Sequence, residues 1–215
     1  MKLVLYDYWR SGAAYRTRIA LHLKGLAFDQ VAVDLRLGEQ REEAYLARNP
    51  QGLVPLLEAD GRPLVQSVAI LEWLEEVHPQ PPLLPSGPEA RSLVRAMAAI
   101  VGCDMHPLNN MRVQQQLRGP LGASEEQVSA WIARWITEGF TALEAMIAAH
   151  GGLYAYGDAP TLADCYLTPQ VYSAERFAVD LTPFPAIRRV TDHARSQPAF
   201  LAAHPDRQPD APPPS

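Results

Sequence analysis

The chemistry that this sequence could perform is concentrated where a short apolar run, Leu3–Tyr6, passes through a turn into a helical pattern that begins after Ser11. Apolar residues recur behind the turn at helical spacing, at Ile19, Leu23 and Leu26. The start of a helix presents unpaired backbone N–H groups and the positive end of the helix dipole, which favour an anion such as a thiolate or a carboxylate. Ser11 is therefore a candidate for stabilising an anion. The alternative is that Ser11 only caps the helix, because serine is a common N-cap residue.

Two further positions could hold an anion. Arg10 lies directly beside Ser11, and a guanidinium group binds a carboxylate through two parallel hydrogen bonds while it stays charged at any working pH. Ser67 is predicted to be the N-cap of another helix, in front of a buried stripe that begins at Ile70. From the residues alone, a surface salt bridge is the favoured role for Arg10 and plain capping is the favoured role for Ser67.

The elements that position the turn alternate between strand and helix patterns from residue 1 to about 78. The predicted strands are 2–7, 28–34, 54–58 and 63–65, and the predicted helices are 13–24, 41–48 and 67–78. The last two strands flank Asp60-Gly61, and Asp-Gly between apolar runs is a strong hairpin signal. We therefore expect these strands to pair antiparallel within an α/β domain.

A proline-rich stretch then interrupts the pattern, because proline removes backbone donors and disfavours helical geometry before it. Beyond it we expect an all-α domain with helices at 89–117, 124–149, 161–176 and 185–196. Thr161 and Asp164 have the spacing of a capping box, so their expected role is structural. The last ten residues include four prolines and are expected to be mobile. The predicted organisation is a domain at 1–80, a linker at 81–88, a second domain at 89–205 and a tail at 206–215.

Composition restricts the class of protein. The 215 residues are 47% apolar, which is enough to bury a full core. The net charge is -5 and no run of Lys or Arg is present, so neither nucleic acid nor an anionic membrane surface is the expected partner. The longest uncharged apolar run, 96–103, is far shorter than the roughly 20 residues of a membrane span, and we expect a cytoplasmic protein. Cys103 and Cys165 show no metal-type spacing and are expected to be reduced, packed thiols.

The chain carries a set of short motifs at Arg10–Leu21, Asn49-Pro50, Val54-Pro55, Gln66-Ser67, 173–177 and 180–183. Together they resemble the glutathione transferase family over nearly the whole chain. More narrowly, they resemble its zeta class, which includes maleylacetoacetate isomerases and the bacterial maleylpyruvate isomerases of aromatic-acid catabolism. The resemblance implies a thioredoxin-like α/β domain followed by an all-α domain, and it implies a homodimer.

The resemblance also implies a glutathione site. Pro55 would be the cis-proline of a thioredoxin-like fold, which exposes the backbone of Val54 to pair with the cysteinyl part of glutathione as an added strand would. A trans proline in a hairpin is the alternative. Gln66 and Ser67 would hold the γ-glutamyl carboxylate at a helix N-terminus. The residues expected to contact glutathione are Ser11, Gly12, Ala13, Gln40, Val54, Pro55, Gln66, Ser67, His106, Asn110 and Arg112.

The chain departs from the family at the turn itself. Eukaryotic members carry Ser-Ser-Cys where this chain has Ser11-Gly12-Ala13. Ala13 offers no thiol, so the reactive sulfur must come from glutathione, and Gly12 leaves Ser11 as the only side-chain donor of the turn. A free thiol with a pKa of about 8.5 is only a few per cent thiolate at neutral pH, so a hydroxyl donor at a helix N-terminus would increase the reactive fraction.

The substrates of the zeta class are cis-enedioic acids with a conjugated keto group. Their isomerisation requires temporary loss of the double bond, which reversible addition of the glutathione thiolate supplies. Two carboxylates need fixed cations, and the expected anchors are Arg10 and Arg176, the latter because its segment matches the substrate-binding arginine of the family. A helix-capping or interdomain pair is the alternative for Arg176. The other arginines considered are expected on the solvated surface: Arg16, Arg18, Arg36 and Arg91.

Two local signals disagree on the substrate. The segment around His106 resembles the maleylpyruvate branch, although a packed histidine is the alternative for that side chain. Met111 is apolar where that branch can carry arginine, and Arg112, about 100° further around a helix, cannot simply replace it. We expect maleylpyruvate to be preferred by a modest margin. Two other functions stay open: a transferase that conjugates or dehalogenates small electrophiles, and a non-catalytic interaction module.

Overall fold

The structure is a computed structural model of the chain and describes residues 1–213. Its contacts divide the chain into two units, one formed by Met1–Leu83 with the C-terminal segment from Ser196, the other by Leu84–Arg195. The boundary after Leu83 falls inside the predicted linker. The prediction that 89–205 forms one domain is wrong at its end, because the residues after Arg195 pack on the first unit.

The first unit contains a four-stranded mixed sheet with the order β2-β1-β3-β4. Its strands are β1 (Leu3–Asp7), β2 (Asp29–Ala32), β3 (Leu56–Ala59) and β4 (Arg62–Val65). β1 pairs parallel with β2 and antiparallel with β3, and β3 pairs antiparallel with β4. The predicted hairpin is confirmed, since Asp60 and Gly61 take φ angles of 49° and 78°, as a two-residue hairpin turn with both φ angles positive requires.

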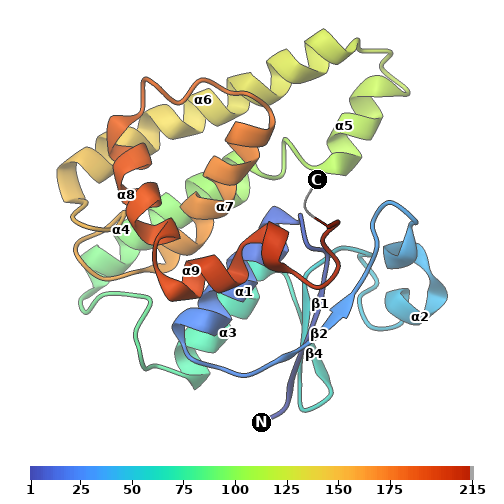
Figure 1. The fold of residues 1–215 in the computed structure, drawn as a ribbon, viewed down its shortest axis with the longest axis horizontal. Coiled ribbons are helices and arrows are strands. Elements are labelled where there is room, and N and C mark those ends of the chain that lie inside the picture. The colour runs from blue at the N-terminus through green and yellow to red at the C-terminus, as the bar shows by residue number, and fades with distance from the viewer. Residues whose placement is uncertain (214–215) are drawn as a thin grey trace. The chain divides into compact units, whose positions relative to one another are not determined.

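Helices complete the first unit. They are α1 (Gly12–Leu23), η1 (Glu39–Arg41), α2 (Glu43–Leu46), α3 (Ser67–Val77), α9 (Pro198–Ala203) and η3 (Pro205–Arg207). The predicted helix at 41–48 is present only as the short η1 and α2. α9 was not predicted as a separate helix, and it lies beside α1 in the same unit (Figure 1).

Because α1 packs against α3 and α9, charged residues on it are buried. Arg16 is 2% exposed and Arg18 is fully buried, so the expectation that both lie on the solvated surface is wrong. Arg18 Nη1 donates to Oδ1 and Oδ2 of Asp7 at 2.8 and 2.6 Å. Burial raises the pKa of the Asp7 carboxyl, although the nearby Arg18 guanidinium acts in the opposite direction. Arg36 is exposed as expected and pairs with Asp34.

The second unit is helical. Its elements are α4 (Pro88–Ala99), η2 (Ile100–Met105), α5 (Met111–Arg118), α6 (Glu125–His150), α7 (Leu162–Arg176) and α8 (Pro185–Arg195). The predicted continuous helix at 89–117 is wrong, because the π-helical η2 and a turn separate α4 from α5. Pro107 lacks a backbone donor in that turn, and Asn110 starts α5 by capping it.

Close packing of η2 against α6 depends on Gly139. A Cβ atom at this position would lie 2.3 Å from Sδ of Met105, the last residue of η2. The backbone of α6 therefore approaches η2 more closely than any other residue type would allow. This contact positions the turn that carries His106.

The predicted capping box is confirmed. Thr161 caps α7, and Oδ2 of Asp164 accepts from the Thr161 backbone N–H at 2.8 Å. Oδ1 of Asp164 accepts from the Ala155 N–H at 2.8 Å. Burial nevertheless raises the pKa of Asp164 to about 6, against the effect of these hydrogen bonds.

The C-terminal segment differs from the expected mobile tail as far as the structure describes it. Gln208 is 7% exposed, and Ala211 packs against a hydrophobic cluster of the first unit. Its low apolar content did not reveal these contacts because most of them are hydrogen bonds of polar side chains, such as those of Gln208, rather than apolar packing. Pro214 and Ser215 of the predicted tail lie outside the described residues.

Candidate functional site

The turn between β1 and α1 has the geometry of a helix start. The Ser11 N–H donates to the Tyr8 carbonyl at 2.8 Å, and the Ser11 backbone is extended, with φ −67° and ψ 118°. Ser11 Oγ accepts from the Ala14 N–H at 3.3 Å, so the capping role is confirmed. A hydroxyl group has two lone pairs and one hydrogen, so accepting from Ala14 leaves its O–H able to donate to an anion. Capping and anion stabilisation are therefore compatible.

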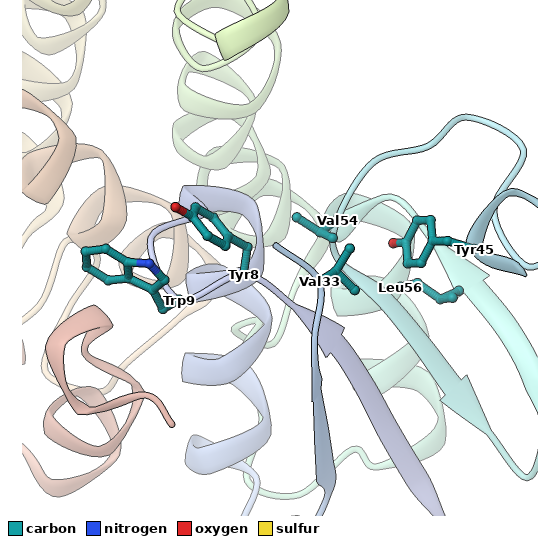
Figure 2. Packing of buried hydrophobic residues seen from close by; sticks show 6 residues of the cluster. All are labelled: Tyr8, Trp9, Val33, Tyr45, Val54 and Leu56. Carbon is teal, nitrogen blue, oxygen red and sulfur yellow. The ribbon is translucent and has the colours of Figure 1, made fainter. Parts of the chain in front are cut away.

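A hydrophobic cluster holds this turn in place. Figure 2 shows Tyr8 and Trp9, from the loop that follows β1, together with the other members of the cluster. The cluster consists of Tyr8, Trp9, Val33, Tyr45, Val54 and Leu56. Tyr8 and Trp9 are 6% and 8% exposed, although they lie within three residues of Ser11. Their burial fixes the chain that leads into α1.

The same cluster brings Val54 to the turn. The Val54-Pro55 peptide bond is cis, as the resemblance implies. Within residues 1–213, the N–H and C=O of Val54 pair with no other backbone group, which leaves them available to an extended ligand. Gln40 lies in η1 of the same unit, and its Oε1 is buried without a hydrogen-bond partner among the described residues.

The start of α3 provides a third group of donors. Its N-cap is Gln66, so the prediction that Ser67 is the N-cap is wrong by one residue. Gln66 has φ 68° and ψ 116°, a strained conformation of the kind that collects at ligand sites, and its Nε2 donates to Gln51 Oε1 at 2.5 Å. Ser67 is buried, and Arg16 Nη1 donates to its Oγ at 3.4 Å. Helix N–H groups, a hydroxyl and a guanidinium fit a carboxylate.

Arg16 is the functional candidate that the sequence reasoning missed. Position 16 lies one helical turn after Gly12, so both residues share a face of α1. That spacing was the available signal. The expectation of a solvated arginine failed because the pattern does not show that α3 begins beside this face.

Other predicted site residues belong to the second unit. His106 follows η2 and is half-buried. Oδ1 of Asn110 accepts from the Arg112 backbone N–H at 3.1 Å, so Asn110 has a capping role, while the Arg112 residue is exposed. Arg176 is exposed in the last turn of α7, with its guanidinium carbon 4.5 Å from the centre of the Phe177 ring.

Arg10 belongs to the first unit and is exposed next to Ser11. Its guanidinium carbon lies 5.2 Å from the centre of the Trp9 ring. Stacking on a buried tryptophan limits the directions that the side chain can take. The structure therefore places in the first unit all the expected contacts before residue 80, whereas His106, Asn110, Arg112 and Arg176 lie in the second.

The donor set fits glutathione. The donors at the start of α1 match a thiolate, and those at the start of α3 match a carboxylate. The Val54 backbone, which pairs with no backbone group in residues 1–213, matches a peptide. Both cysteines belong to the second unit, where Cys165 is buried but Cys103 is exposed, so the expectation that both are packed is wrong for Cys103. Among the described residues, no group of His, Cys, Asp and Glu could hold a metal ion, and no helix is long and apolar enough to cross a membrane.

Comparison with known proteins agrees with this fit. Residues 1–76 match the family model for the glutathione S-transferase N-terminal domain. The chain is 52% identical to a maleylpyruvate isomerase of Ralstonia sp over 209 residues, which cover 96% of this chain and 99% of that protein. It is 53% identical to a maleylacetoacetate isomerase of Pseudomonas aeruginosa over 211 residues, with coverage of 97% and 98%.

Solved structures agree as well. A holo structure of maleyl pyruvate isomerase, a bacterial zeta-class glutathione transferase, has a TM-score of 0.95 and 51% identity, and the match covers 97% of this chain and 100% of that one. A maleylacetoacetate isomerase of Anaeromyxobacter dehalogenans 2CP-1, with dicarboxyethyl glutathione and citrate bound in the active site, has a TM-score of 0.89 and 49% identity, with coverage of 99% and 98%. The chain belongs to the glutathione transferase family, in its zeta class of maleylpyruvate and maleylacetoacetate isomerases.

Proposed function

We propose that this protein is a glutathione-dependent cis–trans isomerase of maleyl keto-diacids and that maleylpyruvate is its preferred substrate. The observation that carries the proposal is the helix start at Ser11, which offers a hydroxyl donor in a unit that contains no cysteine. The isomerase names of relatives that match over almost their whole length support the reaction type.

Ser11 is the residue that stabilises the reactive sulfur. Glutathione supplies, when bound, a thiolate that adds reversibly to the substrate double bond and so permits rotation. The Ser11 O–H donates a hydrogen bond to that sulfur, while the N–H groups at the start of α1 and the helix dipole favour its negative charge. The Gly12 and Ala13 backbones belong to this first turn of α1.

The rest of the cofactor is held by the first unit. Val54 pairs its backbone with the cysteinyl part, beside cis-Pro55. Ser67 and Gln66 hold the γ-glutamyl carboxylate at the start of α3, and Arg16 orients the Ser67 hydroxyl. Gln40 receives a donor of the ligand on its buried Oε1. Three residues of the second unit complete the proposed contacts: His106, Asn110 and Arg112.

Arg10 and Arg176 hold the substrate carboxylates. Both are exposed arginines with a guanidinium group placed against an aromatic ring. Citrate and a dicarboxyethyl group occupy the active site of the relative from Anaeromyxobacter, which supports a polycarboxylate site in this protein. Removing either arginine leaves a carboxylate unpaired. The transition-state stabilisation calculated from kcat/KM should therefore fall by about 2 to 4 kcal/mol.

A glutathione-dependent assay with maleylpyruvate and maleylacetoacetate side by side tests the proposal. The parent should isomerise both and turn over maleylpyruvate somewhat faster. Arg176→Ala should lose activity on both diacids, whereas Arg188→Ala, which removes another exposed arginine of the same unit, should not. Equal activity of Arg176→Ala and the parent would place the substrate elsewhere. A clear preference for maleylacetoacetate would overturn only the choice of substrate, and conjugation of small electrophiles without isomerisation would overturn the reaction.

We also propose that the protein is a cytoplasmic homodimer. The zeta-class resemblance supports the dimer, and the reduced state expected for its two cysteines supports the location. Sedimentation equilibrium of the parent, which should give twice the mass of one chain, tests the dimer.

A further inference from the structure

The residue that binds the backbone immediately before the catalytic turn comes from the far end of the chain. Oδ2 of Asp210 accepts a hydrogen bond from the Trp9 backbone N–H at 2.8 Å, across a separation of 201 residues. Trp9 lies beyond the end of β1 at Asp7, so its N–H is outside the strand ladder. It also lies two positions before Ser11. The Asp210 contact is therefore made where the chain leaves the sheet and turns into α1.

The carbonyl of the same residue is fixed from the other side. Arg18 Nη2 donates to the Trp9 carbonyl at 2.9 Å. The Arg18 guanidinium is itself held by Asp7 and by the Ala203 carbonyl of α9, to which its Nε donates at 3.0 Å. Both backbone groups of Trp9 thus depend, directly or through Arg18, on residues after 195.

The segment that presents Asp210 is well anchored in the first unit. We call residues 208–211 the C-terminal clasp. Gln208 Nε2 donates to the carbonyls of Ala202 and His204 at 2.9 and 2.7 Å, and its Oε1 accepts from Gln30 Nε2 at 2.9 Å. The Ala211 N–H donates to the Gln208 carbonyl, and Ala211 packs against the cluster that contains Trp9. Asp210 is held between these two anchors.

We propose that Asp210 is a positioning residue, and that the C-terminal clasp holds the β1–α1 turn in the geometry that Ser11 needs to activate glutathione. The hydrogen bond from the Trp9 N–H to Asp210 Oδ2 fixes the Trp9 peptide at the point where sheet hydrogen bonding has ended. A displacement of about 1 Å at a catalytic group can lower activity by about 100-fold. The activity part of this inference rests on the proposed function.

The role of Asp210 is geometric rather than electrostatic. A second negative charge near the turn would disfavour a thiolate, so the carboxylate charge does not itself help catalysis. Asparagine keeps an acceptor oxygen without the charge, whereas alanine removes the acceptor. Asp210→Ala should therefore impair the enzyme, and Asp210→Asn should remain close to the parent.

The test compares these two variants with the parent and with Asp206→Ala. Asp206 is an exposed carboxylate just outside the clasp, so it is a matched control. The structural readout is hydrogen–deuterium exchange of the peptide that spans Trp9 and Ser11, without glutathione. Exchange should become faster in Asp210→Ala only. The chemical readouts are the pH midpoint of the bound glutathione thiol, followed by ultraviolet absorbance, and kcat. In Asp210→Ala the midpoint should rise and kcat should fall about 10-fold or more.

Two results would overturn the inference. The first is that Asp210→Ala has the same exchange rate at Trp9 and the same pH midpoint of the bound thiol as Asp206→Ala. The other is an Asp210→Asn variant as impaired as Asp210→Ala, which would assign the effect to charge. Thermal unfolding of each variant shows whether it is folded. If Asp210→Ala does not fold, the comparison of Asp210→Asn with the parent decides whether the inference holds. A parent without isomerase activity would refute the proposed function, while the exchange result would still test the clasp.

Discussion

Replacing Ser11 by alanine removes two interactions whose magnitudes differ. The first is the N-cap hydrogen bond from the Ala14 N–H to Ser11 Oγ, at 3.3 Å. Loss of a serine cap lowers the free energy of unfolding by about 0.5 to 2 kcal/mol, and the length of this bond places the expected loss near the lower end. The variant should therefore fold.

The second is the hydrogen bond that, in the proposed function, the Ser11 hydroxyl donates to the sulfur of glutathione. A hydrogen bond to a charged group contributes about 1.5 to 3 kcal/mol, which corresponds to a rise of about 1 to 2 in the pKa of the bound thiol. At neutral pH this reduces the thiolate fraction. The variant also loses stabilisation of the charge that is present during the reaction. Because of these two effects, kcat should fall by about 10- to 1000-fold, with little change in glutathione affinity.

The assay is steady-state isomerisation measured across a pH series. The rate difference between the parent and Ser11→Ala should narrow at high pH, because both enzymes then hold mostly thiolate. Ser124→Ala is the matched control, since Ser124 Oγ caps α6 by accepting from the Gln127 N–H at 3.2 Å. It should lose similar stability and no activity. Unaltered turnover of Ser11→Ala, or an equal loss in Ser124→Ala, would refute the role of the hydroxyl.

The remaining predictions concern the cofactor contact and stability. Ser67→Ala should raise the KM for glutathione more than it changes kcat, because the contact is equal in ground and transition states; a fall in kcat at constant KM would contradict this. Lys24 Nζ pairs with the buried Glu75 carboxylate at 2.8 Å, so Lys24→Met should lower the free energy of unfolding in urea titrations by about 3 to 5 kcal/mol. Adding Glu75→Leu should restore most of the lost stability, because no unpaired charge then stays buried. Asp164 holds its proton more tightly in the folded state, with a pKa of about 6 against an ordinary 3.8, so its contribution is complete below pH 3.8 and is lost as the pH rises through about 6. The unfolding free energy of the parent relative to Asp164→Asn should fall by about 3 kcal/mol between pH 3.8 and about 6. A difference that stays constant with pH would show that burial does not raise the pKa of Asp164.

The features that the sequence determined by itself are local. The hairpin at Asp60-Gly61, the cap at Ser11 and the capping box of Thr161 and Asp164 each follow from residues within a few positions of one another. Their donors and acceptors meet whenever the local backbone forms, so the pattern alone was sufficient. The order of strands and helices from β1 to α3 was predictable for the same reason.

Other features were decided by partners far away in the chain. Arg18 is buried because Asp7 and the Ala203 carbonyl meet it, and Ala203 is 185 residues away. Arg16 is buried beside Ser67, and the C-terminal residues are anchored to the first unit through contacts such as that of Asp210 with Trp9. A charged or proline-rich segment carries no local mark of such partners. The tertiary structure brings an acceptor to each donor and so offsets the cost of removing it from water. Only that structure could show that these polar groups are buried.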